Sequence, residues 1–130
     1  MKLITIPISH YCERIRWTFE YIGLPYEEVQ HLQAFHYRHV KPYGGRTVPV
    51  LVHDDGQALI DSSPIMQWAD EQAPEDRKLY PADTEARAAM QAREQQLCDV
   101  FGVETRRVMY HHFFKWGRRA LGFNAGQAPG

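Results

Sequence analysis

The chain has 130 residues, of which 44% are hydrophobic and 24% are charged, as is usual for a globular protein with a hydrophobic core. Its net charge of −1 provides no basic surface for nucleic acid or an anionic membrane, so neither partner is expected. No apolar run is long enough to cross a bilayer. Two cysteines are too few for a disulfide framework, and this low number favours a reducing, cytoplasmic compartment.

The first segment predicts a parallel βαβ unit. Residues 3–6 are β-prone, and Ser9 is a good N-cap for a helix whose apolar residues repeat at helical spacing over residues 15–22. A second strand is expected at residues 26–30, and consecutive strand, helix and strand favour a right-handed parallel unit. Residues 32–41 predict an irregular helix.

A β-hairpin and another helix are expected next. Residues 48–53 and 57–60 are β-prone, and the Asp-Asp-Gly sequence between them is typical of a hairpin turn. Ser62 or Ser63 is predicted to cap the following helix, with Pro64 at its first position. The order βαβ-ββα predicts an α/β domain with a four-stranded mixed sheet.

The last third of the chain predicts helix. One apolar stripe has the spacing of a single long helix and consists of Ala86, Met90, Leu97, Phe101 and Val108. Gly102 is expected to kink that helix. We expect residues 1–76 to form the α/β domain, residues 84–119 the first part of a truncated all-α domain, and residues 120–130 a disordered tail.

Pro49 lies inside a β-prone run, where a proline removes a ladder donor. If the Val48–Pro49 bond is cis, the N–H and C=O of Val48 point outward and can pair with an extended peptide. The alternative is an edge-strand proline that binds no ligand. Considered by itself, Pro49 favours this alternative, because few X–Pro bonds are cis.

Asp61 and Ser62 stand at a predicted helix start. The free N–H groups and partial positive charge of a helix N-terminus suit a carboxylate, to which Ser62 adds a hydroxyl donor. Asp61 is suited to an ammonium group, so the pair fits an amino-acid end with both charges on one carbon. Simple helix capping is the alternative.

Ser9 and Cys12 lie at the first strand-to-helix turn. The Ser9 hydroxyl can donate to a ligand's thiolate and lower that thiol's pKa, or it can serve only as an N-cap. Cys12 can be a low-pKa thiol in the first helical turn or a small buried apolar residue. The seven histidines are not spaced as a metal-ligand set, so no metal is expected.

The order of these signals resembles the N-terminal domain of cytosolic glutathione transferases over roughly residues 1–82. The motifs that carry the resemblance are residues 9–17, 23–28, 48–51, 61–62 and 79–81. The resemblance implies a thioredoxin-like fold with a cis Pro49, followed by the first helix of the family's C-terminal domain, a helix that takes part in the family's dimer interface. A homodimer is therefore expected.

The resemblance also implies glutathione as co-substrate, held by the Val48 backbone beside Pro49 and by Asp61 and Ser62. Ser9 falls where serine-type classes have the hydroxyl that activates the thiol. Basic candidates for the glycine carboxylate of glutathione are Arg46, Lys41 and Arg38.

We therefore expect a glutathione transferase-like enzyme of detoxification, in which the thiolate attacks an electrophilic small molecule. Two alternatives stay open. One is a glutathione-dependent thiol-disulfide oxidoreductase that uses Cys12. The other is a non-catalytic module for glutathione binding or interaction.

Overall fold

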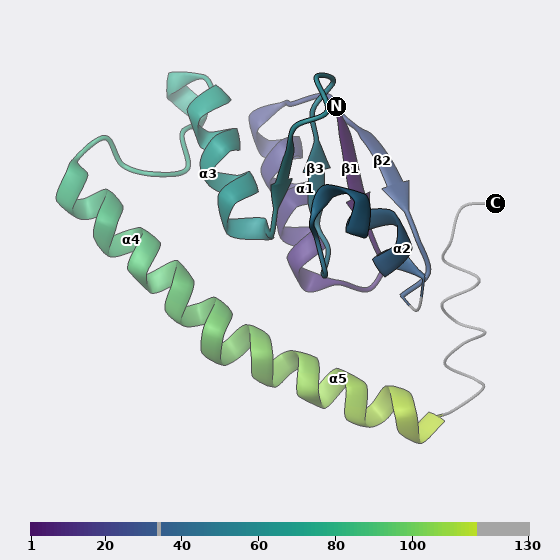
Figure 1. Ribbon diagram of the computed structural model, residues 1–130. Helices are drawn as coiled ribbons and strands as arrows, with labels where there is room; N and C mark the ends of the chain where they lie inside the picture. The colour runs from purple at the N-terminus through teal and green to yellow at the C-terminus, as the bar shows by residue number, and fades with distance from the viewer. Residues whose placement is uncertain (34, 117–130) are drawn as a thin grey trace.

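The computed structural model describes residues 1–33 and 35–116 (Figure 1). In chain order the larger elements are β1 (Lys2–Thr5), α1 (His10–Ile22), β2 (Glu27–Gln30), α2 (His36–Val40), β3 (Val50–Val52), β4 (Ala58–Ile60), α3 (Ser62–Gln72), α4 (Thr84–Leu97) and α5 (Val103–Trp116). Two short 3₁₀ turns, η1 (Lys41–Tyr43) and η2 (Glu75–Arg77), and a π-helical segment, η3 (Cys98–Gly102), connect them. None of the described helices is both long and apolar enough to cross a membrane.

The sheet has four strands in the order β2-β1-β3-β4. β1 and β2 are parallel, with Leu3 opposite Glu28, whereas β3 is antiparallel to both β1 and β4, with Leu51 between Leu3 and Leu59. The predicted parallel βαβ unit and hairpin are both confirmed, and together they form the mixed sheet expected of a thioredoxin-like domain.

Hydrophobic cores lie on both faces of this sheet. The alternating side chains of β1 separate them, because Leu3 faces α1 and α3 while Ile4 faces α2 (Figure 1). The first core contains Phe19 of α1 and Ile65 of α3, and the second contains Val40 of α2. Packing on both faces fixes the strand ends, and the loops at those ends form the site described below.

The start of α3 differs from the prediction. Asp61 occupies the N-cap position, Ser62 is the first helical residue and Pro64 is the third, so the expected serine cap is wrong. Asp61 has φ of 75°, which is unusual for a residue other than glycine. Its side chain makes no capping bond and instead accepts a hydrogen bond from Thr47. The carboxylate thus does not cap the helix that it precedes.

The C-terminal helical region forms one long, curved arm that passes beside the α/β domain (Figure 1). A π-helical segment that ends at Gly102 separates α4 from α5, at the residue where a kink was predicted. Gly102 packs against the Tyr11 ring so closely that an added Cβ would collide with the Tyr11 hydroxyl. Four larger members of the predicted stripe are exposed on this chain: Met90, Leu97, Phe101 and Val108.

The predicted domain limits at residues 76 and 84 stay a prediction. The expected disordered tail, residues 120–130, lies outside the described residues.

Candidate functional site

A cavity of about 520 Å³ lies between the α/β domain and the helical arm. Five segments form its wall: the β1–α1 turn, the segment from β2 to the start of α2, the segment before β3, the start of α3, and the arm from α4 to α5. Ser9, Val48, Pro49, Asp61 and Ser62, which are far apart in the sequence, all line it. The structure therefore brings most of the predicted site residues together.

Ser9 caps α1 and faces the cavity. Its Oγ accepts a hydrogen bond of 3.3 Å from the N–H of Cys12, so the hydroxyl proton is not used in the cap. A hydroxyl proton in this position can be donated to a group bound in the cavity. The N-cap reading and the ligand-donor reading of Ser9 are therefore compatible.

Cys12 points away from this cavity wall into the core between the sheet and α2. Its side chain is fully buried. Burial raises the pKa of the Cys12 thiol, and hydrogen bonds of the thiol itself with the Ser9 side chain and the Ile6 backbone offset this only in part. Both observations argue against Cys12 as the reactive thiol.

The Val48–Pro49 peptide bond is cis, as the resemblance implied. Val48 precedes β3, and among the described residues neither its N–H nor its C=O takes part in a backbone–backbone hydrogen bond of the loops and turns. The carbonyl of Pro49 accepts a bond of 3.2 Å from the Asp61 N–H. The segment before β3 thus carries an unpaired backbone edge beside the start of α3.

The start of α3 offers a partner for each charge of an amino-acid end, namely N–H donors for its carboxylate and a carboxylate for its ammonium. The N–H groups of Ser62 and Ser63 open the helix without an intrahelical partner, and Pro64 has no N–H to offer. The exposed carboxylate of Asp61 lies next to them, and Ser62 is 5% exposed. Helix donors, a hydroxyl and a carboxylate therefore meet at one corner of the cavity.

Lys41 and Arg46 are exposed and do not line the cavity. Gln33 and His36 line the cavity instead. The His36 Nδ1 contacts the Gln33 carbonyl. Sequence reasoning considered the histidines only as possible metal ligands, so it missed His36. The described residues contain no group of three or more His, Cys, Asp or Glu side chains arranged to hold a metal ion.

The arm supplies the far wall of the cavity, which the sequence analysis did not predict. Cys98, Arg106 and Tyr110 line it, together with His10 and Tyr11 from α1. Tyr11 donates a bond of 3.1 Å to the Cys98 carbonyl, and Gln33 donates one of 2.6 Å to the Tyr110 hydroxyl. No local motif identifies these residues, because their approach depends on how the arm packs.

Two groups on this wall have shifted pKa values. Partial desolvation lowers the pKa of His10, with a further contribution from the positive charge of Arg106. Partial desolvation also raises the pKa of Tyr11. At neutral pH both groups are therefore expected in their neutral forms, and Arg106 is the cation of the far wall.

Comparisons with known proteins identify the domain. Residues 3–77 match the family described as glutathione S-transferase, N-terminal domain. A comparison with curated proteins gave no significant match.

Several solved structures are similar to this chain. One is the holo structure of a maleyl pyruvate isomerase, a bacterial glutathione S-transferase of the zeta class, with TM-score 0.66, 29% identity and coverage of 94% of this chain and 57% of that one. A Methylobacterium radiotolerans glutathione S-transferase in complex with glutathione sulfonate has TM-score 0.61, 30% identity and coverage of 75% and 46%. A Methylobacillus flagellatus glutathione S-transferase with bound GSH shares the fold at 23% identity, with TM-score 0.68 and coverage of 97% and 63%.

The chain thus spans between 46% and 63% of the length of these three structures. Its α/β domain accounts for the family match, and the arm accounts for the wider structural overlap. The chain belongs to the glutathione S-transferase family, and residues 3–77 match the N-terminal domain of that family.

Proposed function

We propose that the chain binds glutathione in the cavity and activates its thiol for attack on an electrophilic small molecule. The observation that carries the proposal is the meeting of Ser9, Val48, Asp61 and Ser62 on one cavity wall. Bound glutathione or glutathione sulfonate in related structures supports the same ligand class.

The γ-glutamyl end of glutathione would lie at the start of α3. Its carboxylate would accept hydrogen bonds from the helix N–H groups and the Ser62 hydroxyl, and its ammonium would pair with Asp61. The unpaired backbone groups of Val48 would pair with the main chain of the cysteinyl residue. This arrangement directs the cysteinyl sulfur toward Ser9.

For the glycine carboxylate, Arg46 and Lys41 stay predictions, but His36 and Gln33 are better situated because they line the wall. Because the Gln33 carbonyl can only accept, His36 Nδ1 carries a proton, and the other ring nitrogen donates to a carboxylate when the imidazole is doubly protonated. The Gln33 amide has a second N–H that can donate as well. Replacing either lining residue should therefore affect affinity more than replacing Lys41.

Ser9 would donate its free hydroxyl proton to the thiolate and so favour the ionised form of the ligand's sulfur. The thiolate would form a carbon–sulfur bond with a soft electrophile. Either a leaving group departs with the electron pair, or a proton from water completes an addition. Tyr11, Cys98 and Arg106 would contact the electrophile from the far wall.

The chain is also proposed to act in the cytoplasm and to form a homodimer. Both cysteines are free thiols in this structure, which fits a reducing, cytoplasmic setting. A role in detoxification would follow from the proposed attack on electrophiles. The exposed stripe on the arm, formed by Met90, Leu97, Phe101 and Val108, offers an apolar surface for a homodimer.

Ser9→Ala tests the mechanism with glutathione and a panel of soft electrophiles. Turnover should fall by about tenfold or more while the Kd of glutathione changes by less than about threefold. Equal losses in turnover and in glutathione affinity would mean that Ser9 only positions the ligand. Saturable binding without turnover on any electrophile would select the non-catalytic module.

A further inference from the structure

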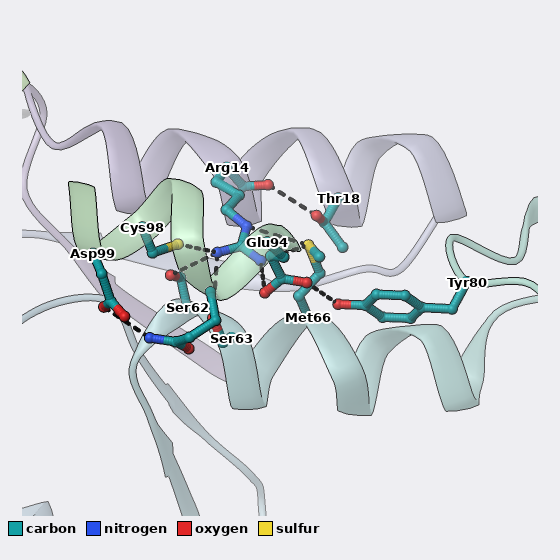
Figure 2. A network of polar contacts seen from close by, with 10 residues as sticks. Arg14, Thr18, Ser62, Ser63, Met66, Tyr80, Glu94, Cys98 and Asp99 are labelled. Carbon is teal, nitrogen blue, oxygen red and sulfur yellow. Dashed lines mark hydrogen bonds and ion pairs between the residues drawn. The ribbon is translucent and has the colours of Figure 1, made fainter. Parts of the chain in front are cut away.

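Arg14 of α1 lies behind the cavity wall and is the centre of a polar network that joins three helices (Figure 2). Its Nη1 lies 3.3 Å from Ser62 Oγ, 3.4 Å from Ser63 Oγ and 3.3 Å from Cys98 Sγ, so its two N–H groups are shared among three acceptors. Its Nε and Nη2 each lie 3.3 Å from Met66 Sδ. The guanidinium thus connects the start of α3 to the arm.

Glu94 of α4 balances the charge of Arg14. The Arg14 Nη2 is ion-paired with Glu94 Oε1, and the Tyr80 hydroxyl donates to Glu94 Oε2 (Figure 2). The Arg14 and Glu94 side chains are only 20% and 15% exposed. Two charges with so little contact with water are tolerated because they form an ion pair with each other. The planar guanidinium of arginine also donates to several acceptors at once.

The contact between Arg14 and Ser62 determines which of the two side chains donates the hydrogen bond. A guanidinium has donors and no acceptor, so Ser62 Oγ must accept from Arg14. The single hydroxyl proton of Ser62 is then available for another acceptor, and Ser62 lines the cavity. An anion at the start of α3 is an acceptor of the required kind.

We infer that Arg14 is a positioning residue for anion binding at the start of α3, an inference that rests on the proposed function. Arg14 holds the Ser62 hydroxyl with its proton toward the γ-glutamyl carboxylate. Through Glu94, the helical arm in turn fixes Arg14, so the arm influences the glutathione subsite without touching the ligand there.

A double-mutant cycle tests this role by calorimetric titration with glutathione. The proteins are the wild type, Arg14→Lys, Ser62→Ala and the double variant. Lysine keeps a positive charge beside Glu94 but lacks the fork that reaches Glu94 and Ser62 together, so this variant is expected to fold. Arg14→Lys should weaken binding about three- to tenfold, as loss of an orienting hydrogen bond predicts, but by less than about twofold in the Ser62→Ala background.

Arg16→Lys is the matched control. Arg16 lies on the same helix, is 15% exposed, and pairs with Glu13 and Glu28 at 2.7 Å each, but it neither lines the cavity nor contacts Ser62. Its Kd should stay within about twofold of the wild type. A second variant, Glu94→Gln, keeps Arg14 and should weaken binding less than Arg14→Lys does.

The outcomes separate two failures. If the wild type binds and the effects of Arg14→Lys and Ser62→Ala multiply, or if Arg14→Lys binds like the wild type, this inference is overturned and the proposed function survives. Absence of glutathione binding by the folded wild type overturns both.

Discussion

The Thr47 hydroxyl donates a hydrogen bond of 3.0 Å to Oδ1 of Asp61. This bond joins the residue before Val48 to the residue before α3, two loops that are separated by the β3–β4 hairpin. It also accounts for the absence of a side-chain cap at α3, because the Asp61 carboxylate is directed to Thr47 instead. Both residues line the cavity, so Thr47 orients a proposed ligand group.

Thr47→Val should therefore weaken glutathione binding by about three- to tenfold, the usual range for one hydrogen bond to a charged group at an open site. Stability should change by less than about 0.5 kcal/mol, because both side chains are exposed. Calorimetric titration and urea unfolding give the two values. Thr84→Val, at the exposed start of α4, is the control, and equal affinities for all three proteins would remove the role given to Thr47.

Asp70 connects α3 to the segment before the arm. Its buried Oδ1 accepts from the N–H groups of Leu79 at 2.6 Å and Tyr80 at 3.2 Å, and Arg87 of α4 lies 3.1 Å from Oδ2. Asp70→Ala would leave two shielded N–H groups and one arginine without this acceptor. The free energy of unfolding should fall by about 2–4 kcal/mol in urea titrations.

Asp83→Ala is the comparison for Asp70. Asp83 caps α4 by accepting 2.8 Å from the Ala86 N–H, but it is exposed. Its loss should cost about 1 kcal/mol, as is usual for an N-cap. A smaller effect for Asp70→Ala than for Asp83→Ala would contradict the structural importance of the buried carboxylate.

The two cysteines should differ in reactivity. Cys12 is fully buried and has a raised pKa because burial disfavours its thiolate, whereas Cys98 is partly exposed and lines the cavity. Iodoacetamide at neutral pH should therefore modify Cys98 first, as mass spectrometry of the digested protein would detect. Faster modification of Cys12 in the folded protein would revive the thiol-disulfide alternative.

Glu28 should make stability depend on acidic pH. Burial disfavours its carboxylate, but hydrogen bonds from Thr5, Arg16 and Gln30 outweigh this and lower the Glu28 pKa. The unfolded value is about 4.3, so the folded protein binds this proton less readily than the unfolded chain. The stabilisation is present above about pH 4.3 and is lost as pH falls through the lower folded pKa.

Urea unfolding of the wild type and Glu28→Gln, from about pH 6 down to about pH 3, measures this contribution. The stability gap between the two proteins should narrow as the pH falls. Lys2→Gln, which removes only an exposed pair with Glu27 at 3.7 Å, should run parallel to the wild type. A constant gap for Glu28→Gln would show that the carboxylate does not titrate as described.

Much of the α/β domain was predictable because its signals are local. The apolar spacing of α1, the hairpin turn and the order of strands determine the sheet, and the resemblance supplied the cis bond before Pro49. The predicted serine cap of α3 was wrong because Asp61, with φ of 75°, occupies the N-cap position, and its carboxylate bonds Thr47 in a distant loop. Local pattern cannot reveal that contact.

The same distinction applies to the cavity. Ser9, Val48, Asp61 and Ser62 follow strand ends or helix starts, so their shared wall was predictable. Lys41 and Arg46 lie in a connection whose path depends on η1, and neither reaches the wall. Cys98, Arg106 and Tyr110 reach it only because the arm packs on α1 and the segment before α2, through contacts such as Tyr11 with the Cys98 carbonyl and Gln33 with Tyr110.

Calorimetric titration of the wild type and Asp61→Ala with glutathione tests the central claim most directly. The account predicts saturable binding to the wild type and a loss of at least about tenfold in Asp61→Ala, because the ligand's ammonium would lose its charged partner. No binding by the folded wild type at millimolar glutathione, or equal binding by both proteins, would contradict it.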